Sequence, residues 1–238
     1  MTEDQLVKDI VDYLEEKVFD NHISASLNQN AKLKSYKINP IIVKYLSQVL
    51  ENNYTALGVA KALFYPRVLG TSINTSFGTR IQTMFVILGI ASGSMISGMD
   101  IEFTDHLDNR KKWCQLKAGP NTINHDDVIP LINKFTKTIN LARTNSALKG
   151  ISNNDFIVGV LYGEENELSQ HYLNINKSHP VIVGKEFWHR VTGFANFYDK
   201  LVIQLHKKIE TLDTKDLINK GCEKLAKEIE ASPLFDFS

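Results

Sequence analysis

The sequence predicts an α/β fold in which a mixed β-sheet is flanked by helices. Three observations support this prediction. Residues 1–75 and 193–238 have mainly helical periodicity, residues 98–119 have the pattern of a β-hairpin, and residues 155–162 form a β-branched and aromatic run typical of a central strand covered on both faces. Because no repeat, linker or low-complexity tract interrupts the 238 residues, we expect a single domain.

The first third of the chain is expected to be mainly helical. Thr2 stands in a capping position ahead of apolar residues at helical spacing, and Asn39 with Pro40 is a typical helix start. Pro66 should end a helix, because proline disfavours a helical conformation in the residue before it. The expected segments are helices over 2–18, 41–50, 54–64 and 77–91, with a polar, asparagine-rich stretch over 21–37 and a loop over 70–76.

Strands and helices alternate in the rest of the chain. Asp126 and Asp127 can cap a helix that begins at Val128, and Pro130 is tolerated in its first turn. The last helix is amphipathic, which suits packing or a dimer interface. The elements expected after the hairpin are a helix over 128–148, the strand over 155–162, short strands over 171–175 and 180–183, and helices over 185–191, 196–212 and 213–231.

Charge and cysteine content restrict the class of protein. The 27 basic and 27 acidic residues give a formal net charge of zero, so a polyanionic partner would have to meet cations that are clustered locally. The chain has two cysteines, Cys114 and Cys222, which are too few for a disulfide framework and match no zinc spacing. We therefore expect the protein to reside in a reducing cytoplasm. No apolar run approaches the roughly 18 residues of a membrane span, and we expect no membrane partner.

The hairpin carries the residues with the clearest chemistry. Asp100 lies near the start of its first strand, while Gln115 and Lys117 lie two residues apart on the second strand and so share a face. Hydrolysis of a phosphodiester needs a metal ion, and Mg²⁺ prefers one or two carboxylates with water and phosphate oxygens. A lysine nearby can hold the attacking water and stabilise the pentacovalent phosphate. We therefore expect a Mg²⁺ site with Asp100 as first ligand and Lys117 as catalytic lysine.

The pattern Asp100-(x14)-Gln115-x-Lys117 resembles the PD-(D/E)xK nuclease motif, in which an acid most often stands where this chain has Gln115. An amide carbonyl can coordinate a cation but brings no charge to offset it. Glu102 lies two residues after Asp100, hence on the same strand face, and could supply the missing carboxylate. The second metal ligand is therefore either Gln115 or Glu102.

Three further blocks extend this resemblance over roughly residues 77–188. They are Gln115-Leu-Lys-Ala-Gly-Pro-Asn-Thr-Ile-Asn124, Ile157-Val-Gly-Val-Leu-Tyr-Gly163 and Gly184-Lys-Glu-Phe-Trp188. Together they resemble a branch of the type II restriction endonucleases. The resemblance implies a restriction-endonuclease-like fold, and the helices at either end of the chain are not part of it. We therefore expect one nuclease domain with a catalytic core over 76–192, a mainly helical N-terminal region over 1–75 and C-terminal helices over 193–238.

The same resemblance implies an activity and its partners. The expected reaction is Mg²⁺-dependent cleavage of both strands of double-stranded DNA at a short, nearly palindromic site by a homodimer. Some relatives read interrupted sites with a GGNCC core. A companion methyltransferase would protect the same site without having to bind the nuclease.

Six polar side chains are candidates for DNA contact. Arg80 follows Gly78 at a helix start, where backbone N–H groups can meet a phosphate; alternatively Gly78 only eases the chain into the helix and Arg80 lies in solvent. The polar side chains after Lys117 could bind DNA or stabilise their own loop, and the basic run at 110–112 could bind phosphate or simply be solvated. The six candidates are Arg67, Arg80, Asn121, Thr122, Asn124 and Lys185.

Two other functions are compatible with these residues. A repair or recombination nuclease of the same fold would cut without sequence preference or recognise branched DNA. A non-catalytic DNA-binding protein that keeps the nuclease fold is suggested by the neutral Gln115, and it would retain DNA but leave a plasmid intact in Mg²⁺. A hydrolase triad is excluded, because serine, histidine and aspartate form no recognisable nucleophile signature.

Overall fold

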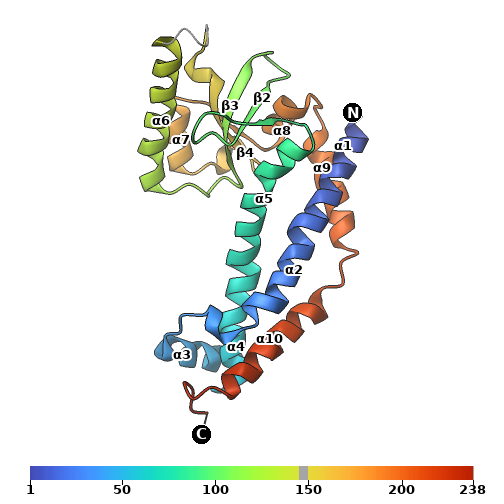
Figure 1. Cartoon of the computed structure of the whole chain (residues 1–238), viewed down its shortest axis with the longest axis vertical. Coiled ribbons are helices and arrows are strands. Elements are labelled where there is room, and N and C mark those ends of the chain that lie inside the picture. The colour runs from blue at the N-terminus through green and yellow to red at the C-terminus, as the bar shows by residue number, and fades with distance from the viewer. Residues whose placement is uncertain (145–149, 238) are drawn as a thin grey trace. The chain divides into compact units, whose positions relative to one another are not determined.

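The computed structural model describes residues 1–144 and 150–237, and the chain divides into two compact units (Figure 1). Unit 1 holds the β-sheet, and unit 2 is helical. The boundaries between the units fall inside three helices. The ranges are Met1–Val11 with Gly78–Lys207 for unit 1, and Asp12–Phe77 with Lys208–Ser238 for unit 2. The helices that cross the boundaries are α1 (Glu3–Leu14), α5 (Ile73–Ile87) and α9 (Phe197–Ile209).

Unit 1 is built on a mixed sheet whose five strands lie side by side in chain order. The first three strands pair antiparallel, and the last three pair parallel. The mixed sheet, the hairpin and the buried central strand are therefore confirmed, as is the short strand that follows Pro180. The strands are β1 (Ser92–Gly93), β2 (Ile101–Thr104), β3 (Lys111–Lys117), β4 (Phe156–Val160) and β5 (Val181–Val183).

One face of the sheet packs against helices α6 (His125–Thr144) and α7 (Gln170–Asn176). Trp113 of β3 stacks on Phe156 of β4, with ring centroids 5.2 Å apart, and Phe135 of α6 packs on the same pair. Figure 1 shows α6 and α7 together on this side of the sheet. The end of α6 predicted near residue 148 lies outside the described residues.

The opposite face packs against helix α8 (Gly184–Thr192). Phe187 of α8 reaches the sheet at Gly159, where a Cβ atom would lie 2.3 Å from the Phe187 ring and 2.8 Å from Cys114 Sγ. Glycine at this position is therefore a packing requirement. Strand β4 is buried on both of its faces, as its β-branched sequence predicts.

A buried ion cluster fixes the hairpin turn against the start of β4. Asp155, which is only 1% exposed, accepts hydrogen bonds from Arg110 Nε at 2.7 Å and from Ser152 N at 2.8 Å. Lys112 Nζ lies 3.5 Å from the same carboxylate and 2.6 Å from Asp108. Burial alone would raise the pKa of Asp155, but the hydrogen bonds from Arg110 and Ser152 lower it to about 2.

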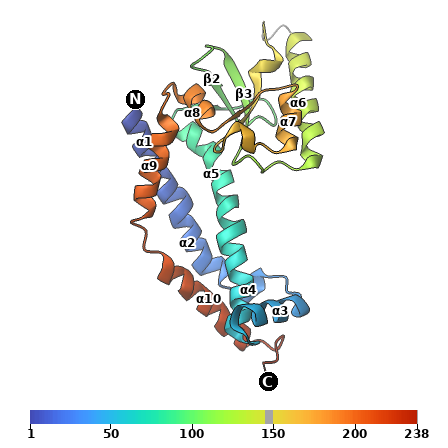
Figure 2. The same cartoon turned by 180° about the vertical axis from the view of Figure 1, so that it is seen from behind.

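Unit 2 has its own core, formed by apolar side chains from helices α4 and α10 and their neighbours, with Phe64 and Leu225 fully buried. Asn39 caps α3 as predicted, because its side chain accepts hydrogen bonds from the N–H groups of Ile41 and Ile42. Figure 2 shows α3, α4 and α10 gathered near the C-terminus. The helices of this unit are α2 (Asn21–Ala25), α3 (Pro40–Glu51), α4 (Ala56–Pro66) and α10 (Lys215–Glu230).

The predicted break after Pro66 is wrong. Helix α4 continues through π-helical turns at Arg67–Ser72 directly into α5, so residues 70–76 form no loop. Proline removes one backbone donor, but Val68 is fully buried in the core of unit 2, and this packing outweighs the local preference. The polar stretch that begins at residue 21 likewise stays helical as far as Asn30.

The predicted strand over residues 171–175 is also wrong, because this segment belongs to helix α7. Its two buried apolar residues, Tyr172 and Ile175, are three positions apart and so lie on one helical face. A run this short has no decisive period, and packing on the sheet selects the helix. The helices predicted over 185–191, 196–212 and 213–231 are confirmed as α8, α9 and α10.

Asp155→Asn should destabilise the protein by roughly 3 kcal/mol, because it leaves two cations next to a buried neutral group. Asp108→Asn is the matched control and should cost less than Asp155→Asn, since its carboxylate is half-exposed and Lys112 keeps its contacts with Asp155 and the Asn154 carbonyl. Urea unfolding at neutral pH measures both losses. Equal losses in the two variants would contradict the role given to Asp155.

The same cluster should make stability depend on pH in the acid range. The pKa of Asp155 is lower in the folded chain than its ordinary 3.8, so its contribution is complete above that value and is lost as pH falls toward about 2. The acid dependence of the unfolding free energy should therefore be shallower in Asp155→Asn than in the wild type. Unfolding curves over this range measure the difference.

Candidate active site

Asp100 and Gln115 meet at the open end of the β2–β3 hairpin. The strand register pairs Ile101 with Cys114, which places Asp100 opposite Gln115 on the same face. Asp100 Oδ2 accepts hydrogen bonds from Gln115 Nε2 and from Leu116 N, both at 2.7 Å. Two of the residues that the sequence predicts for the centre, Asp100 and Gln115, are therefore in direct contact.

The carboxyl group of Asp100 is half-buried, and this burial raises its pKa above the ordinary value. The hydrogen bond from Leu116 N–H and the positive charges of Lys117 and Lys134 act in the opposite direction. Gln82 Nε2 donates a hydrogen bond to the backbone carbonyl of Asp100 at 3.0 Å, which ties α5 to the start of β2. Asp100 is thus a partly desolvated carboxylate held at both its backbone and its side chain.

A cleft of about 220 Å³ opens beside Gln115 and Lys117. Lys117 lies two residues after Gln115 on β3 and so shares its face of the sheet. The opposite wall comes from α6 and from the loop before it. The lining residues are Gln115, Lys117, Ile123, Asp127, Pro130, Leu131 and Lys134.

Glu102 lies on the same strand face as Asp100, as its spacing predicts, but its carboxylate has other partners. It accepts hydrogen bonds from Ser94 Oγ at 2.7 Å and Met95 N at 3.1 Å, and it pairs with Lys111 Nζ at 2.5 Å. Burial opposes its ionisation, but the hydrogen bonds from Lys111 and Ser94 lower its pKa below the ordinary value. Both oxygens of Glu102 therefore already have partners from its own hairpin and the segment before β2.

The side-chain oxygens of Asp100 and Gln115 are suitable ligands for a divalent metal ion such as Mg²⁺. Asp100 uses Oδ2 for its two hydrogen bonds, which leaves Oδ1 for a cation, and Gln115 donates through Nε2, which leaves its carbonyl oxygen. Mg²⁺ needs only one or two protein ligands and keeps several waters. Within residues 1–144 and 150–237, no group of three or more histidine, cysteine, aspartate or glutamate side chains forms a metal cage.

The loop after Lys117 places three DNA-contact candidates near the cleft. Asn121 and Asn124 are exposed. The Thr122 hydroxyl donates to the Gly119 carbonyl at 2.8 Å and lies 3.1 Å from the Tyr172 hydroxyl, so it stabilises its own loop. All three residues are exposed, but the Thr122 hydroxyl is used within its own loop, whereas the two asparagines present polar groups at the surface.

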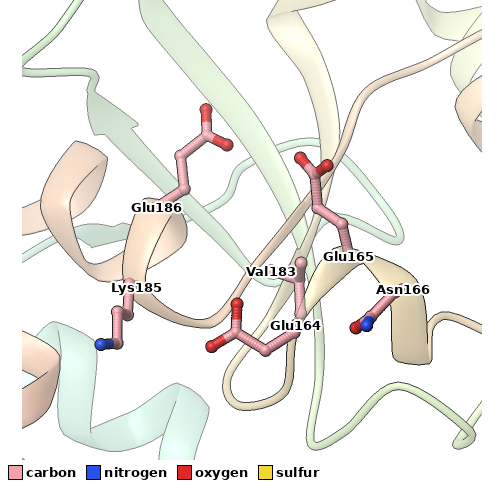
Figure 3. Close-up of a pocket in the computed structure, with 6 residues that line it drawn as sticks. All are labelled: Glu164, Glu165, Asn166, Val183, Lys185 and Glu186. Carbon is pink, nitrogen blue, oxygen red and sulfur yellow. The ribbon is translucent and has the colours of Figure 1, made fainter.

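The other three candidates lie elsewhere in the chain. Arg67 belongs to the π-helical turns of unit 2, and Arg80 belongs to α5 in unit 1. Lys185 pairs with Asp199 at 2.9 Å and lines a separate cleft of about 460 Å³, whose walls carry three glutamates (Figure 3). These neighbouring carboxylates weaken the attraction of Lys185 for a phosphate.

The three basic side chains at 110–112 all form ion pairs within the protein. Arg110 and Lys112 pair with Asp155, and Lys111 pairs with Glu102. These cations stabilise the hairpin rather than project a free positive patch.

Sequence reasoning missed two charged residues of the cleft, Asp127 and Lys134. It assigned Asp127 to a helix cap and gave Lys134 no role. Their spacing of seven residues, with Leu131 between them, puts all three on one face of α6. The helical period was therefore a usable signal, but only the fold shows that this face meets the end of β3.

The chain matches a known protein family. A family model described as type II restriction endonuclease EcoO109I matches residues 8–213 of the chain. No curated protein matches. Within the part of the chain that the structure describes, no helix is long and apolar enough to cross a membrane.

Asp100→Asn should raise the stability of the protein near neutral pH, because it removes a half-buried charge and keeps an oxygen to accept the two hydrogen bonds. The pKa of Asp100 is raised in the folded chain, so the wild type loses stability relative to the variant as pH rises through that pKa. Thermal unfolding at about pH 4 and pH 8 measures the difference. A gain that did not grow with pH would contradict the burial effect.

Proposed function

Because the chain belongs to the family of the type II restriction endonuclease EcoO109I, we propose that it cuts both strands of double-stranded DNA at a short specific site with Mg²⁺ as cofactor. The family implies a nuclease that acts on DNA. The observation that carries the finer proposal is the contact between Asp100 and Gln115, with Lys117 in the same cleft as Gln115. It places a carboxylate, an amide carbonyl and an ammonium group on one face of two adjacent strands.

Each of these residues has a role in the proposed reaction. Asp100 would hold the metal ion through Oδ1, and Gln115 through its carbonyl oxygen, while its NH₂ group keeps Asp100 oriented. When bound, Mg²⁺ would neutralise charge on the phosphate and make water a better nucleophile. The Lys117 ammonium would orient the attacking water and donate a hydrogen bond to the developing negative charge on the phosphate oxygens.

We propose Gln115 rather than Glu102 as the second metal ligand. Glu102 already has three partners, and withdrawing it would leave Lys111 unpaired and the Met95 N–H without an acceptor. Gln115 needs no rearrangement, since its amide hydrogens face Asp100. The neutral amide brings less charge to the metal than a carboxylate would, so we expect this site to need more Mg²⁺ than one with an acid at this position.

DNA contacts are proposed first for the exposed Asn121 and Asn124, on the loop that follows Lys117. Arg67, Arg80 and Thr122 remain proposed contacts. Lys185 is the weakest of the six, because its charge is offset by Asp199 and by neighbouring glutamates.

We propose a homodimer, since two copies would place one centre on each strand of a nearly palindromic site. An exposed apolar stripe on α3 supports it: Ile41 is 80%, Tyr45 is 67% and Val49 is 59% exposed. These residues are four positions apart and so lie along one face of the helix. The protein is expected to act in the cytoplasm, with its two cysteines reduced and a companion methyltransferase protecting the site.

Plasmid and phage DNA incubated with the wild type and Mg²⁺ should give discrete fragments, and EDTA should abolish them. Lys117→Ala and Asp100→Ala should lower the rate by at least about 100-fold, because the first removes a cation at the phosphate and the second removes the proposed metal ligand. Lys111→Ala is the matched control on the same strand and should retain cleavage. Gel electrophoresis with mapping of the fragment ends is the measurement.

The alternatives give different results in the same experiment. A smear or structure-selective cutting would favour a repair or recombination nuclease. Intact plasmid that is retained by the protein would favour a non-catalytic DNA-binding role. Cleavage by Lys117→Ala at the wild-type rate would place the centre elsewhere.

A magnesium titration distinguishes the two candidates for second ligand. Gln115→Ala should raise the Mg²⁺ concentration that gives half-maximal cleavage by about ten-fold, because it removes a metal ligand. Glu102→Gln should leave this concentration unchanged and should instead lower the unfolding temperature, since it breaks the pair with Lys111. The opposite pattern would make Glu102 the ligand.

A further inference from the structure

Lys134 of α6 lies between two neighbouring clefts. It lines the cleft that holds Gln115 and Lys117, and it also lines a second cleft of about 550 Å³ whose walls include Ile96 and Lys137. Among the described residues that line the cleft of Gln115 and Lys117, Asp127 is the one with a carboxylate side chain. Lys117 and Lys134 line the same cleft, and Gln115 is neutral, so the charged side chains of this cleft are two lysines and one aspartate. The cleft therefore carries a net positive charge.

The ammonium group of Lys134 occupies the space that a side chain at position 98 would need. A Cβ atom on Gly98 would lie 1.3 Å from Lys134 Nζ. Gly98 also has a φ of +85°, in the region that favours glycine. Glycine two residues before Asp100 therefore lets the end of Lys134 lie against the backbone at the start of β2.

Lys134 differs from the cations at the turn end of the hairpin, which have carboxylate partners. Lys111, Lys112 and Arg110 each pair with an aspartate or glutamate, and Arg190 pairs with Asp105. No carboxylate of residues 1–144 or 150–237 forms an ion pair with Lys134.

We propose that Lys134 binds a phosphate of the DNA backbone at the cleft of Lys117, and that Gly98 positions it there. The proposal deepens the proposed function, because it assigns a second phosphate-binding cation to the same centre. An ammonium group beside a cleft, next to a carboxylate but not paired with one, can exchange water for a phosphate oxygen without breaking an internal ion pair. This contact needs no metal ion, so it can be measured in the absence of cleavage.

Fluorescence anisotropy tests the contact with a labelled duplex that carries a GGNCC core, in EDTA, over a range of salt concentrations. Each phosphate contact contributes about 0.9 to the slope of log K against log salt. Lys134→Met should therefore weaken binding and make the slope shallower by about 1. Lys137→Met is the matched control, since it removes the same charge one turn along α6, and it should keep the wild-type slope.

Gly98→Ala provides a second variant that leaves Lys134 in the sequence. The added methyl group would displace the ammonium, so this variant should show the same shallower slope as Lys134→Met. Thermal unfolding of each variant establishes that the protein is folded at the temperature of the binding measurement. Lys134→Met changes an exposed position on a helix and should unfold close to the wild-type temperature.

An unchanged slope in Lys134→Met would overturn the proposal, and so would an equal change in Lys137→Met, because that would reflect the net charge of α6. Failure of the proposed function is a separate result. If the wild type leaves plasmid intact while Lys134→Met shows the shallower slope, the phosphate contact stands and the nuclease activity fails. If the wild type cuts and the slopes are equal, only the role of Lys134 fails.

Discussion

Strand β3 is the constraint on which the rest of unit 1 depends. It pairs antiparallel with β2 and parallel with β4, so its register is set from both sides. Because side chains alternate along a strand, burying Trp113 against Phe156 also determines where Gln115 and Lys117 point. A slip of one residue would move both to the opposite face and put Trp113 next to α8. The core and the candidate active site are therefore positioned by the same strand.

Charged residues of this unit fall into two groups with different roles. At the turn end of the hairpin, the cations are paired with buried or half-buried carboxylates, and these pairs fix the hairpin against β4. At the open end, Lys117 and Lys134 line a cleft beside a carboxylate that is itself held by Gln115 and a backbone N–H. Internal ion pairs hold the first group in a structural role, whereas the second group lines the cleft for which we propose phosphate binding.

The neutral Gln115 gives this centre a different charge balance from one with two acids. The amide can orient Asp100 and offer a carbonyl oxygen, but it leaves a single carboxylate to attract a metal ion. Two lysines on the same cleft favour a phosphate over a free cation. The family match supports a nuclease. In the mechanism proposed above, DNA would supply part of the negative charge that a metal ion requires.

The sequence by itself determined the mixed sheet, the hairpin and the shared face of Gln115 and Lys117, because a period of two is a local property of a strand. The register of β2 on β3, which brings Asp100 opposite Gln115, came from the structure. Only the tertiary structure decided that Glu102 pairs with Lys111, that α6 brings Lys134 to the cleft, and that the chain stays helical after Pro66. Local periodicity tells which residues share a face, whereas the element that packs on that face is chosen by long-range burial. The division into two compact units likewise depends on contacts between segments far apart in the chain.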